Sequence, residues 1–159
     1  MASRLLADEA ATRDFGKALA SALPVPAGCP LVIYLQGDLG AGKTTLCRAI
    51  LRGLGWQGAV RSPTYTLMEP YRLDHPRIVE ALHLDLYRLG DPAELEFLGL
   101  QDGLYQPALW LVEWPEKGCG FLPSPDLWLS LSPAADDSRR LEMTVRHDNP
   151  HGLLESALP

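Results

Sequence analysis

Residues 37–44 read GDLGAGKT and fit the pattern G-x-x-x-x-G-K-[ST] of the Walker A phosphate-binding loop. The flanking residues supply the context that this motif needs. Leu31 to Leu35 form an uninterrupted apolar run, which is typical of a buried parallel strand. In residues 44–54, apolar side chains recur at helical spacing, at Leu46, Ala49, Ile50 and Leu54. The sequence therefore predicts a strand, a glycine-rich turn and a helix in succession.

The residue types in this loop suit the phosphates of a nucleotide. Glycines permit positive φ angles, so backbone N–H groups can turn toward phosphate oxygens. The start of the following helix adds free N–H groups and the positive end of its dipole. We expect Lys43 to act on the phosphates as a cation and the Thr44 hydroxyl to coordinate Mg²⁺. The predicted nucleotide contacts in this stretch are Asp38, Leu39, Gly40, Ala41, Gly42, Lys43, Thr44 and Thr45.

Composition limits the remaining possibilities. A chain of 159 residues suggests one domain, residues 1–159, with a core over about 8–146 and a tail over 147–159. The sequence contains no apolar run of the ~20 residues that span a membrane, and we expect a cytoplasmic protein without membrane contact. The three cysteines match neither a zinc pattern nor a disulfide framework. A net charge of −6, with scattered arginines, disfavours direct binding of RNA or DNA.

Two carboxylates are candidates for catalysis. Residues 109–114 predict a strand that ends near Glu113, and ligands bind beyond the carboxyl ends of such strands. Glu113 is our first choice for a second Mg²⁺ ligand beside Thr44. Residues 81–89 alternate strictly, with leucines on one face and polar residues, including Asp85, on the other. A half-exposed strand would explain this alternation, but aspartate is depleted in strands. We expect Lys43, Asp85 and Glu113 to be catalytic, with Asp85 orienting water or holding the metal through water.

Other segments leave alternatives open. Ser62, Thr64 and Thr66 lie about 20 residues beyond the phosphate loop, a spacing compatible with a nucleotide switch or with a loop that leads to an edge strand. Residues 8–23 predict a helix capped by Asp8, in which Thr12 is either solvated or functional.

The rest of the chain predicts smaller elements. Residues 91–99 predict a short capped helix, and residues 126–132 and 140–146 predict a hairpin with one exposed face. The tail is expected to be a docking helix or disordered, with His147 and His151 solvated.

The identity of the nucleotide follows from a missing motif. A GTPase carries an Asn-Lys-x-Asp segment, and here the only asparagine is Asn149, followed by Pro150. ATP is therefore favoured. Three functions remain open: an ATPase that acts with a partner, a small-metabolite kinase, and a nucleotide-gated adaptor without hydrolysis. A kinase usually has an arginine-rich lid, for which this chain offers only Arg139 and Arg140.

Four segments, residues 37–45, 62–66, 83–89 and 113–116, resemble in order and spacing the TsaE family, small bacterial ATPases of tRNA threonylcarbamoyladenosine biosynthesis. The resemblance spans about residues 8–146. It implies an α/β fold: a single three-layer P-loop NTPase domain with a mixed parallel and antiparallel sheet and a C-terminal hairpin. It also implies ATP and Mg²⁺ as cofactors, TsaD-like and TsaB-like partner proteins, and contact with tRNA only through that complex.

The resemblance also implies roles for individual residues. Thr44 and Glu113 match the magnesium positions, and Asp85 matches a residue needed for hydrolysis. Thr64 lies in the segment that matches a switch, and Thr12 matches a threonine close to the nucleotide base. Arg61 departs from the smaller residue expected before the Ser-Pro pair, a difference that does not affect the phosphate site.

Overall fold

The computed structural model describes residues 1–63, 65–153 and 155–159, so the predicted switch residue Thr64 lies outside the described residues. The described strands are β1 (Ala2–Leu6), β2 (Leu31–Gln36), β3 (Met68–Arg72), β4 (Glu80–Asp85), β5 (Leu109–Glu113), β6 (Leu127–Pro133) and β7 (Arg139–Val145). The helices are α1 (Glu9–Ala22), α2 (Lys43–Gly53) and α3 (Leu100–Gly103), with 3₁₀ turns η1 (Pro92–Leu98), η2 (Pro115–Gly118) and η3 (Glu155–Ala157).

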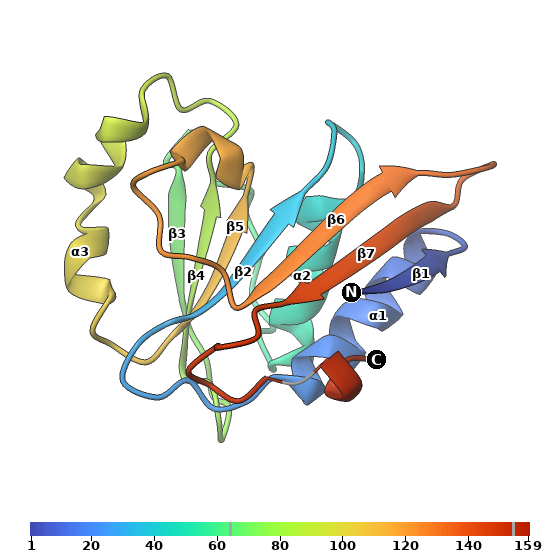
Figure 1. Ribbon diagram of the computed structural model, residues 1–159, viewed down its shortest axis with the longest axis horizontal. Helices are drawn as coiled ribbons and strands as arrows, with labels where there is room; N and C mark the ends of the chain where they lie inside the picture. The colour runs from blue at the N-terminus through green and yellow to red at the C-terminus, as the bar shows by residue number, and fades with distance from the viewer. Residues whose placement is uncertain (64, 154) are drawn as a thin grey trace.

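The seven strands form one mixed sheet in the order β1-β7-β6-β2-β5-β4-β3 (Figure 1). Strands β6, β2, β5 and β4 are parallel, whereas β1, β7 and β3 pair antiparallel with their neighbours. The predicted mixed sheet and C-terminal hairpin are therefore confirmed. Because the parallel strands share a direction, their carboxyl ends lie along one edge of the sheet, where α/β proteins bind ligands.

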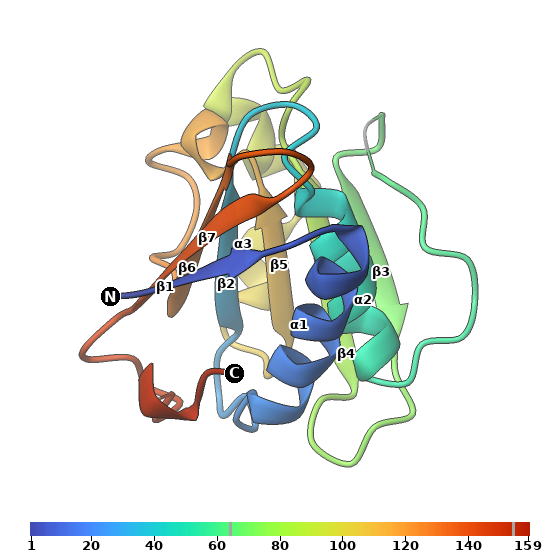
Figure 2. The same cartoon turned by 90° about the vertical axis from the view of Figure 1, so that its right-hand side faces the viewer.

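Alternation along the central strands produces two cores. In β2, Leu31, Ile33 and Leu35 belong to the core beneath α1 and α2, and Val32 and Tyr34 belong to the core on the opposite face. Helices α1 and α2 cover the first face, and the short helices η1 and α3 lie on the second (Figure 2). The molecule thus has the three layers that the sequence analysis predicts.

The two long helices pack closely against each other. Asp8 caps α1 as predicted, because its Oδ1 accepts a hydrogen bond of 2.8 Å from the Ala11 N–H. A Cβ atom placed on Gly16 would lie 2.5 Å from Ala49 Cβ on α2, so glycine is required for this approach. The contact places the middle of α1 against the middle of α2.

Two expectations need correction, and one strand was not anticipated. The predicted strand 81–89 ends at Asp85, and both of its faces are covered, so it is not half-exposed. The prediction that His151 is solvated is wrong, because its side chain is fully buried and hydrogen-bonds to the Pro30 carbonyl. Strand β1 was not predicted.

The described residues contain no helix with the length and apolarity needed to cross a membrane.

Candidate functional site

The alternation of side chains along β4 and β5 determines which of them face helix α2. Leu109 and Leu111 of β5 face the core beneath α2, so Glu113 continues that face at the end of the strand. In β4, Ala81 faces the same core, which directs His83 and Asp85 toward α2 as well. Asp85 and Glu113 are partners in the register of the two parallel strands. The sheet therefore presents two carboxylates side by side at the edge where the phosphate loop begins.

The phosphate loop connects β2 to α2 and lines a cleft. Gly40 and Gly42 adopt φ angles of 82° and 105°, which side chains rarely tolerate. The cleft has a volume of about 200 Å³. Its walls contain seven of the predicted site residues together with Trp114: Leu39, Gly40, Gly42, Lys43, Thr44, Thr45 and Glu113. The other loop residues flank it, with Asp38 exposed and Ala41 packed against the core.

Lys43 is a buried cation in this cleft. Its side chain is 4% exposed, and its Nζ donates hydrogen bonds to the carbonyls of Gly37 and Asp38, the latter at 2.9 Å. The ammonium also lies 4.1 Å from the centre of the Trp114 ring, within the range of a cation–π interaction. Burial lowers the pKa of Lys43, while the nearby Glu113 and Asp85 carboxylates oppose that shift. The cation is thus held at the loop without a direct ion pair in the described structure.

Glu113 and Thr44 are in direct contact. The Thr44 hydroxyl lies 3.0 Å and 2.9 Å from the two carboxylate oxygens and donates to them. Both residues offer oxygen, which is the ligand type that Mg²⁺ prefers. Glu113 is 2% exposed, and a buried carboxylate is costly unless it is paired or coordinates a metal. The chemistry of these two residues fits a divalent cation, which the Thr44 hydroxyl and the Glu113 carboxylate could hold.

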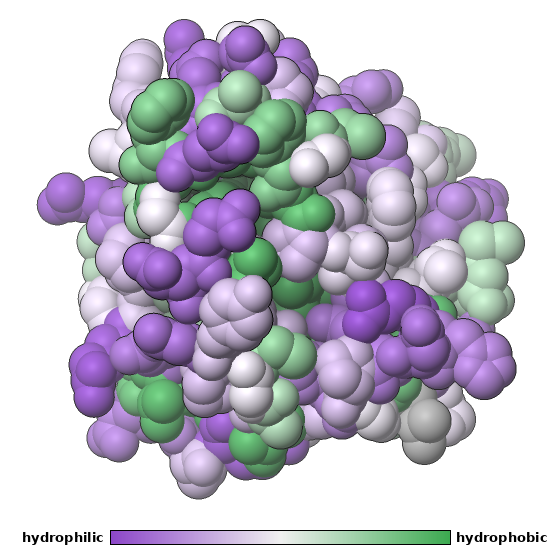
Figure 3. Space-filling view, turned by 60° about the vertical axis from the view of Figure 1, so that its left-hand side comes forward, coloured by the Kyte–Doolittle hydropathy of each residue, from purple (hydrophilic) through white to green (hydrophobic). Residues whose placement is uncertain are grey.

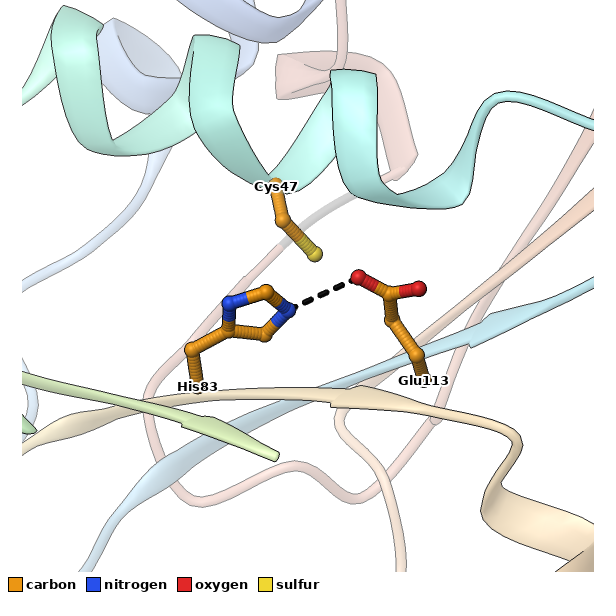
Figure 4. A group of neighbouring side chains, drawn as sticks. All are labelled: Cys47, His83 and Glu113. Atoms are coloured by element: carbon orange, nitrogen blue, oxygen red, sulfur yellow. Dashed lines mark hydrogen bonds and ion pairs between the residues drawn. The ribbon is translucent and has the colours of Figure 1, made fainter. Parts of the chain in front are cut away.

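Two buried side chains hold the far side of the Glu113 carboxylate. His83 Nε2 lies 2.8 Å from Glu113 Oε1. Figure 4 shows Cys47 pointing from α2 toward this pair. The possible ligand atoms of Cys47, His83 and Glu113 lie within 4.8 Å of one another. Burial, with the Glu113 charge beside it, raises the pKa of the Cys47 thiol well above its usual value, so the thiol is a neutral neighbour of the carboxylate. The contacts fix the carboxylate's orientation toward Thr44.

Asp85 lies against the segment that follows the phosphate loop. Its Oδ1 accepts the Tyr87 N–H at 3.1 Å, and its Oδ2 accepts the Ser62 hydroxyl at 3.4 Å. Its own N–H donates to the Leu67 carbonyl. Burial raises the pKa of Asp85; the Tyr87 N–H opposes this shift and the Glu113 charge adds to it. Asp85, the register partner of Glu113, therefore also contacts Ser62 and Leu67, which precede the edge strand β3.

Thr12 lies on the other side of the loop. It is fully buried, so the alternative in which Thr12 is solvated is wrong. The hydroxyl donates to the Asp8 carbonyl at 3.1 Å and accepts Arg139 Nη1 at 3.4 Å. The structure thus separates the predicted site residues into two groups, with Asp85 and Glu113 on one side of the loop and Thr12 on the other.

The sequence analysis assigned no role to His83, Cys47 or Trp114. His83 precedes Asp85 by two residues, so strand alternation alone would have placed both on the face toward α2. Trp114 follows Glu113 with a positive φ of 56°, and this turn directs the ring over Lys43. Local spacing offers no such signal for Cys47, because its contact with β5 depends on how α2 packs on the sheet.

Replacing His83 with alanine is expected to weaken Mg²⁺ binding in the presence of ATP by about 10-fold to 100-fold, the usual cost of losing the residue that orients a metal ligand. The reason is that Glu113 Oε1 loses the partner that fixes it. Mg²⁺ titration of nucleotide-bound protein would measure this change. His83→Gln, which keeps a donor, should restore part of the affinity, and an unchanged Mg²⁺ titration in both variants would contradict this role.

A larger hollow, of about 290 Å³, lies between the β3–β4 edge and α3. Figure 3 shows that side of the molecule, where apolar side chains are recessed between polar ones. Its two charged residues, Arg72 and Glu80, form an ion pair of 3.3 Å with each other. The groups suited to phosphate and metal chemistry therefore gather at the phosphate loop and not in the larger hollow.

Known proteins are similar to this chain in sequence and in fold. The family model described as "Threonylcarbamoyl adenosine biosynthesis protein TsaE" matches residues 6–141. The tRNA threonylcarbamoyladenosine biosynthesis protein TsaE of Haemophilus influenzae is 44% identical over 145 residues, which cover 91% of this chain and 89% of that protein. The TsaE protein of Bacillus subtilis is 35% identical over 131 residues, covering 74% and 80% of the two chains.

A solved structure agrees with these relatives. The crystal structure of Bacillus subtilis YdiB superposes with a TM-score of 0.72 at 28% sequence identity. The superposition covers 91% of this chain and 84% of YdiB. The family match spans the phosphate loop and both strand-terminal carboxylates. This chain belongs to the TsaE family of threonylcarbamoyl adenosine biosynthesis proteins.

Proposed function

We propose that this protein binds ATP with Mg²⁺ at the phosphate loop and hydrolyses it slowly, in support of the threonylcarbamoyladenosine modification of tRNA. The observation that carries the proposal is the contact between the Thr44 hydroxyl and the Glu113 carboxylate beside the buried Lys43 ammonium. A hydroxyl, a carboxylate and a cation next to a glycine-rich loop form the set that phosphoryl transfer requires.

Each residue has a distinct part in this proposal. The loop amides and Lys43 bind and orient the phosphates, and Thr44 and Glu113 hold the metal. When bound, Mg²⁺ supplies positive charge that stabilises the phosphate oxygens during transfer. Asp85, beside Glu113 and tied to Ser62, orients the attacking water. The raised pKa of Asp85 suits a group that accepts a proton transiently.

The partners and the place of tRNA are further parts of the proposal. The relatives' names connect the family to tRNA modification, while the net charge of −6 gives this chain no strong electrostatic attraction to RNA. We therefore propose that it reaches tRNA indirectly, through TsaD-like and TsaB-like proteins. These partners would also complete the site, because the cleft beside Thr44, Glu113 and Trp114 has no arginine among the lining residues that the structure describes.

Adding TsaD-like and TsaB-like proteins is expected to raise the rate of phosphate release from ATP by 10-fold or more. Stabilisation of transition-state charge by a partner is worth up to about 10³–10⁵ in related phosphoryl transfers. A phosphate-release assay during titration with the partners would measure the rate, and Asp85→Ala protein serves as the control. Formation of ADP that requires a small-molecule acceptor and occurs without release of phosphate would favour a kinase. Full tRNA modification by Asp85→Ala protein would favour an adaptor that does not need hydrolysis.

A further inference from the structure

Helix α2 brings a thiol to the buried end of the candidate site. Cys47 lies one helical turn beyond Lys43 and Thr44, on the face of α2 that packs against the sheet. Its side chain points toward the His83 ring and the Glu113 carboxylate (Figure 4). All three residues are buried, with exposed fractions of 0%, 0% and 2%. The proposed binding of phosphates and magnesium leaves this thiol without a chemical role.

The donor atoms of these three side chains are close enough to share one cation. The Cys47 sulfur, a ring nitrogen of His83 and a carboxylate oxygen of Glu113 all lie within 4.8 Å of one another, and His83 Nε2 lies 2.8 Å from Glu113 Oε1. Ligand atoms around a tetrahedral zinc ion lie roughly 3.2 to 3.8 Å apart. Shifts of about 1 Å at the ends of the side chains would therefore create that geometry.

The mixture of donors selects the kind of cation. Thiolate and imidazole are ligands that suit Zn²⁺, whereas Mg²⁺ takes oxygen ligands. A zinc ion held by one thiolate, one carboxylate and a neutral imidazole has no net charge, and an unbalanced charge at a buried position is costly. Cys47 is thus the residue that distinguishes the two cations, because Thr44 and Glu113 offer only oxygen.

The cation needs a path to the site and places for two protons. Glu113 lines the phosphate-loop cleft, so a cation that enters from the cleft meets this carboxylate first. The Cys47 thiol loses its proton to solvent, since a thiol that coordinates a metal is deprotonated. The proton that His83 Nε2 donates to Glu113 moves to Nδ1, which has no hydrogen-bond partner among the residues that the structure describes.

We propose that Cys47, His83 and Glu113 form a binding site for Zn²⁺, and that zinc bound there excludes Mg²⁺ from Glu113. The zinc site stands on the side chains themselves, whereas the competition with Mg²⁺ rests on the proposed function. Two divalent cations bound to one carboxylate repel each other. Zinc is therefore an inhibitor of ATP turnover that acts at the metal position.

Co²⁺, a coloured probe that takes the same ligands as zinc, is expected to give an intense thiolate-to-metal absorption band with nucleotide-free protein. Zn²⁺ should displace the probe and abolish the band. Cys47→Ser keeps the size of the side chain but removes the sulfur. It should lose the band and bind zinc at least about 100-fold more weakly, since losing a ligand costs more than losing a supporting residue.

The other two cysteines supply matched controls. Cys119→Ser changes an exposed thiol, and Cys29→Ser changes the thiol that lies 3.7 Å from His151 Nε2. Both variants should keep the band. A band that persists in Cys47→Ser and disappears in Cys29→Ser would place the metal beside His151 and overturn the inference, as would the absence of a band in the unmodified protein. If Cys47→Ser melts well below the unmodified protein, Cys47→Ala removes the ligand without burying a hydroxyl and should show the same losses.

Inhibition is tested separately from binding. Buffered Zn²⁺ should slow phosphate release from ATP, and raising the Mg²⁺ concentration should relieve the inhibition. In Cys47→Ser, half-inhibition relative to that variant's own rate should require at least about 100-fold more zinc, by the same loss of affinity. Zinc that binds without slowing turnover would overturn the competition with Mg²⁺. Failure of the unmodified protein to bind ATP would overturn the proposed function, whereas the cobalt band would still test the zinc site.

Discussion

Replacement of Lys43 by alanine is expected to lower the affinity for ATP about 100-fold or more, which corresponds to roughly 3 kcal/mol. Lys43 is the cation that lines the loop cleft, and its burial removes the competition from water that weakens exposed charges. Calorimetric titration of each protein with ATP and Mg²⁺ would measure the loss.

Two control measurements make the test of Lys43→Ala specific. The free energy of unfolding without nucleotide should change little in Lys43→Ala protein, because the loss of two hydrogen bonds to carbonyls is offset by relief of a buried charge. Lys117→Ala removes an exposed lysine whose Nζ lies 5.8 Å from the Tyr87 ring centre, and it should leave ATP affinity unchanged. Equal ATP affinity in Lys43→Ala and unmodified protein would show that the phosphate loop does not bind ATP, which contradicts the proposed function.

The features that the sequence predicts well are those specified by neighbouring residues. The loop glycines, the cap at Asp8 and the apolar spacing of α2 act within a few residues, and the structure has the strand, loop and helix that they predict. The short element that begins after Asp91 also has its predicted capping box, although it folds as a 3₁₀ turn. Local rules of geometry and hydrogen bonding are enough for these elements.

Contacts between distant segments could not be read from spacing. The contact between His83 and Glu113 requires β4 and β5 to be neighbours in one particular register, and Arg139 reaches Gly42 because β6 returns beside β2. These facts follow from the order of the whole sheet. The aspartate in β4 was identified as unusual, but the burial of its face was missed because α2 covers that face, a contact that spacing along β4 does not specify.

Strand β1 shows why an edge element can be missed entirely. Of its five residues only Leu6 is buried, so it carries no apolar alternation. Its pairing with β7, from Ala2 opposite Met143 to Leu6 opposite Arg139, uses main-chain groups that every residue offers. This pairing also places Leu6 opposite Arg139, whose side chain donates to Thr12, so an element without a sequence signal lies beside a residue that contacts a predicted site residue.

Glu113→Ala is expected to reduce Mg²⁺-dependent ATP turnover about 100-fold or more while preserving most of the affinity for nucleotide. A metal ion contributes several kcal/mol of charge stabilisation during phosphoryl transfer, and the substitution removes its carboxylate ligand. The loop amides and Lys43, which bind the phosphates, remain in place. Steady-state phosphate release over a range of Mg²⁺ concentrations, together with calorimetric ATP affinities, would separate the two effects.

A second substitution distinguishes the charge of Glu113 from its hydrogen bonds. Alanine leaves the Thr44 hydroxyl and the buried His83 without their shared acceptor, so some loss of folding stability is expected in that variant. Glu113→Gln keeps an oxygen acceptor and nearly the same shape but removes the charge that a divalent cation requires. Turnover should therefore remain low in Glu113→Gln even where stability recovers, whereas the exposed Glu116→Gln should match the unmodified protein. Recovery of turnover along with stability would mean that Glu113 organises the loop through its hydrogen bonds and does not ligate the metal.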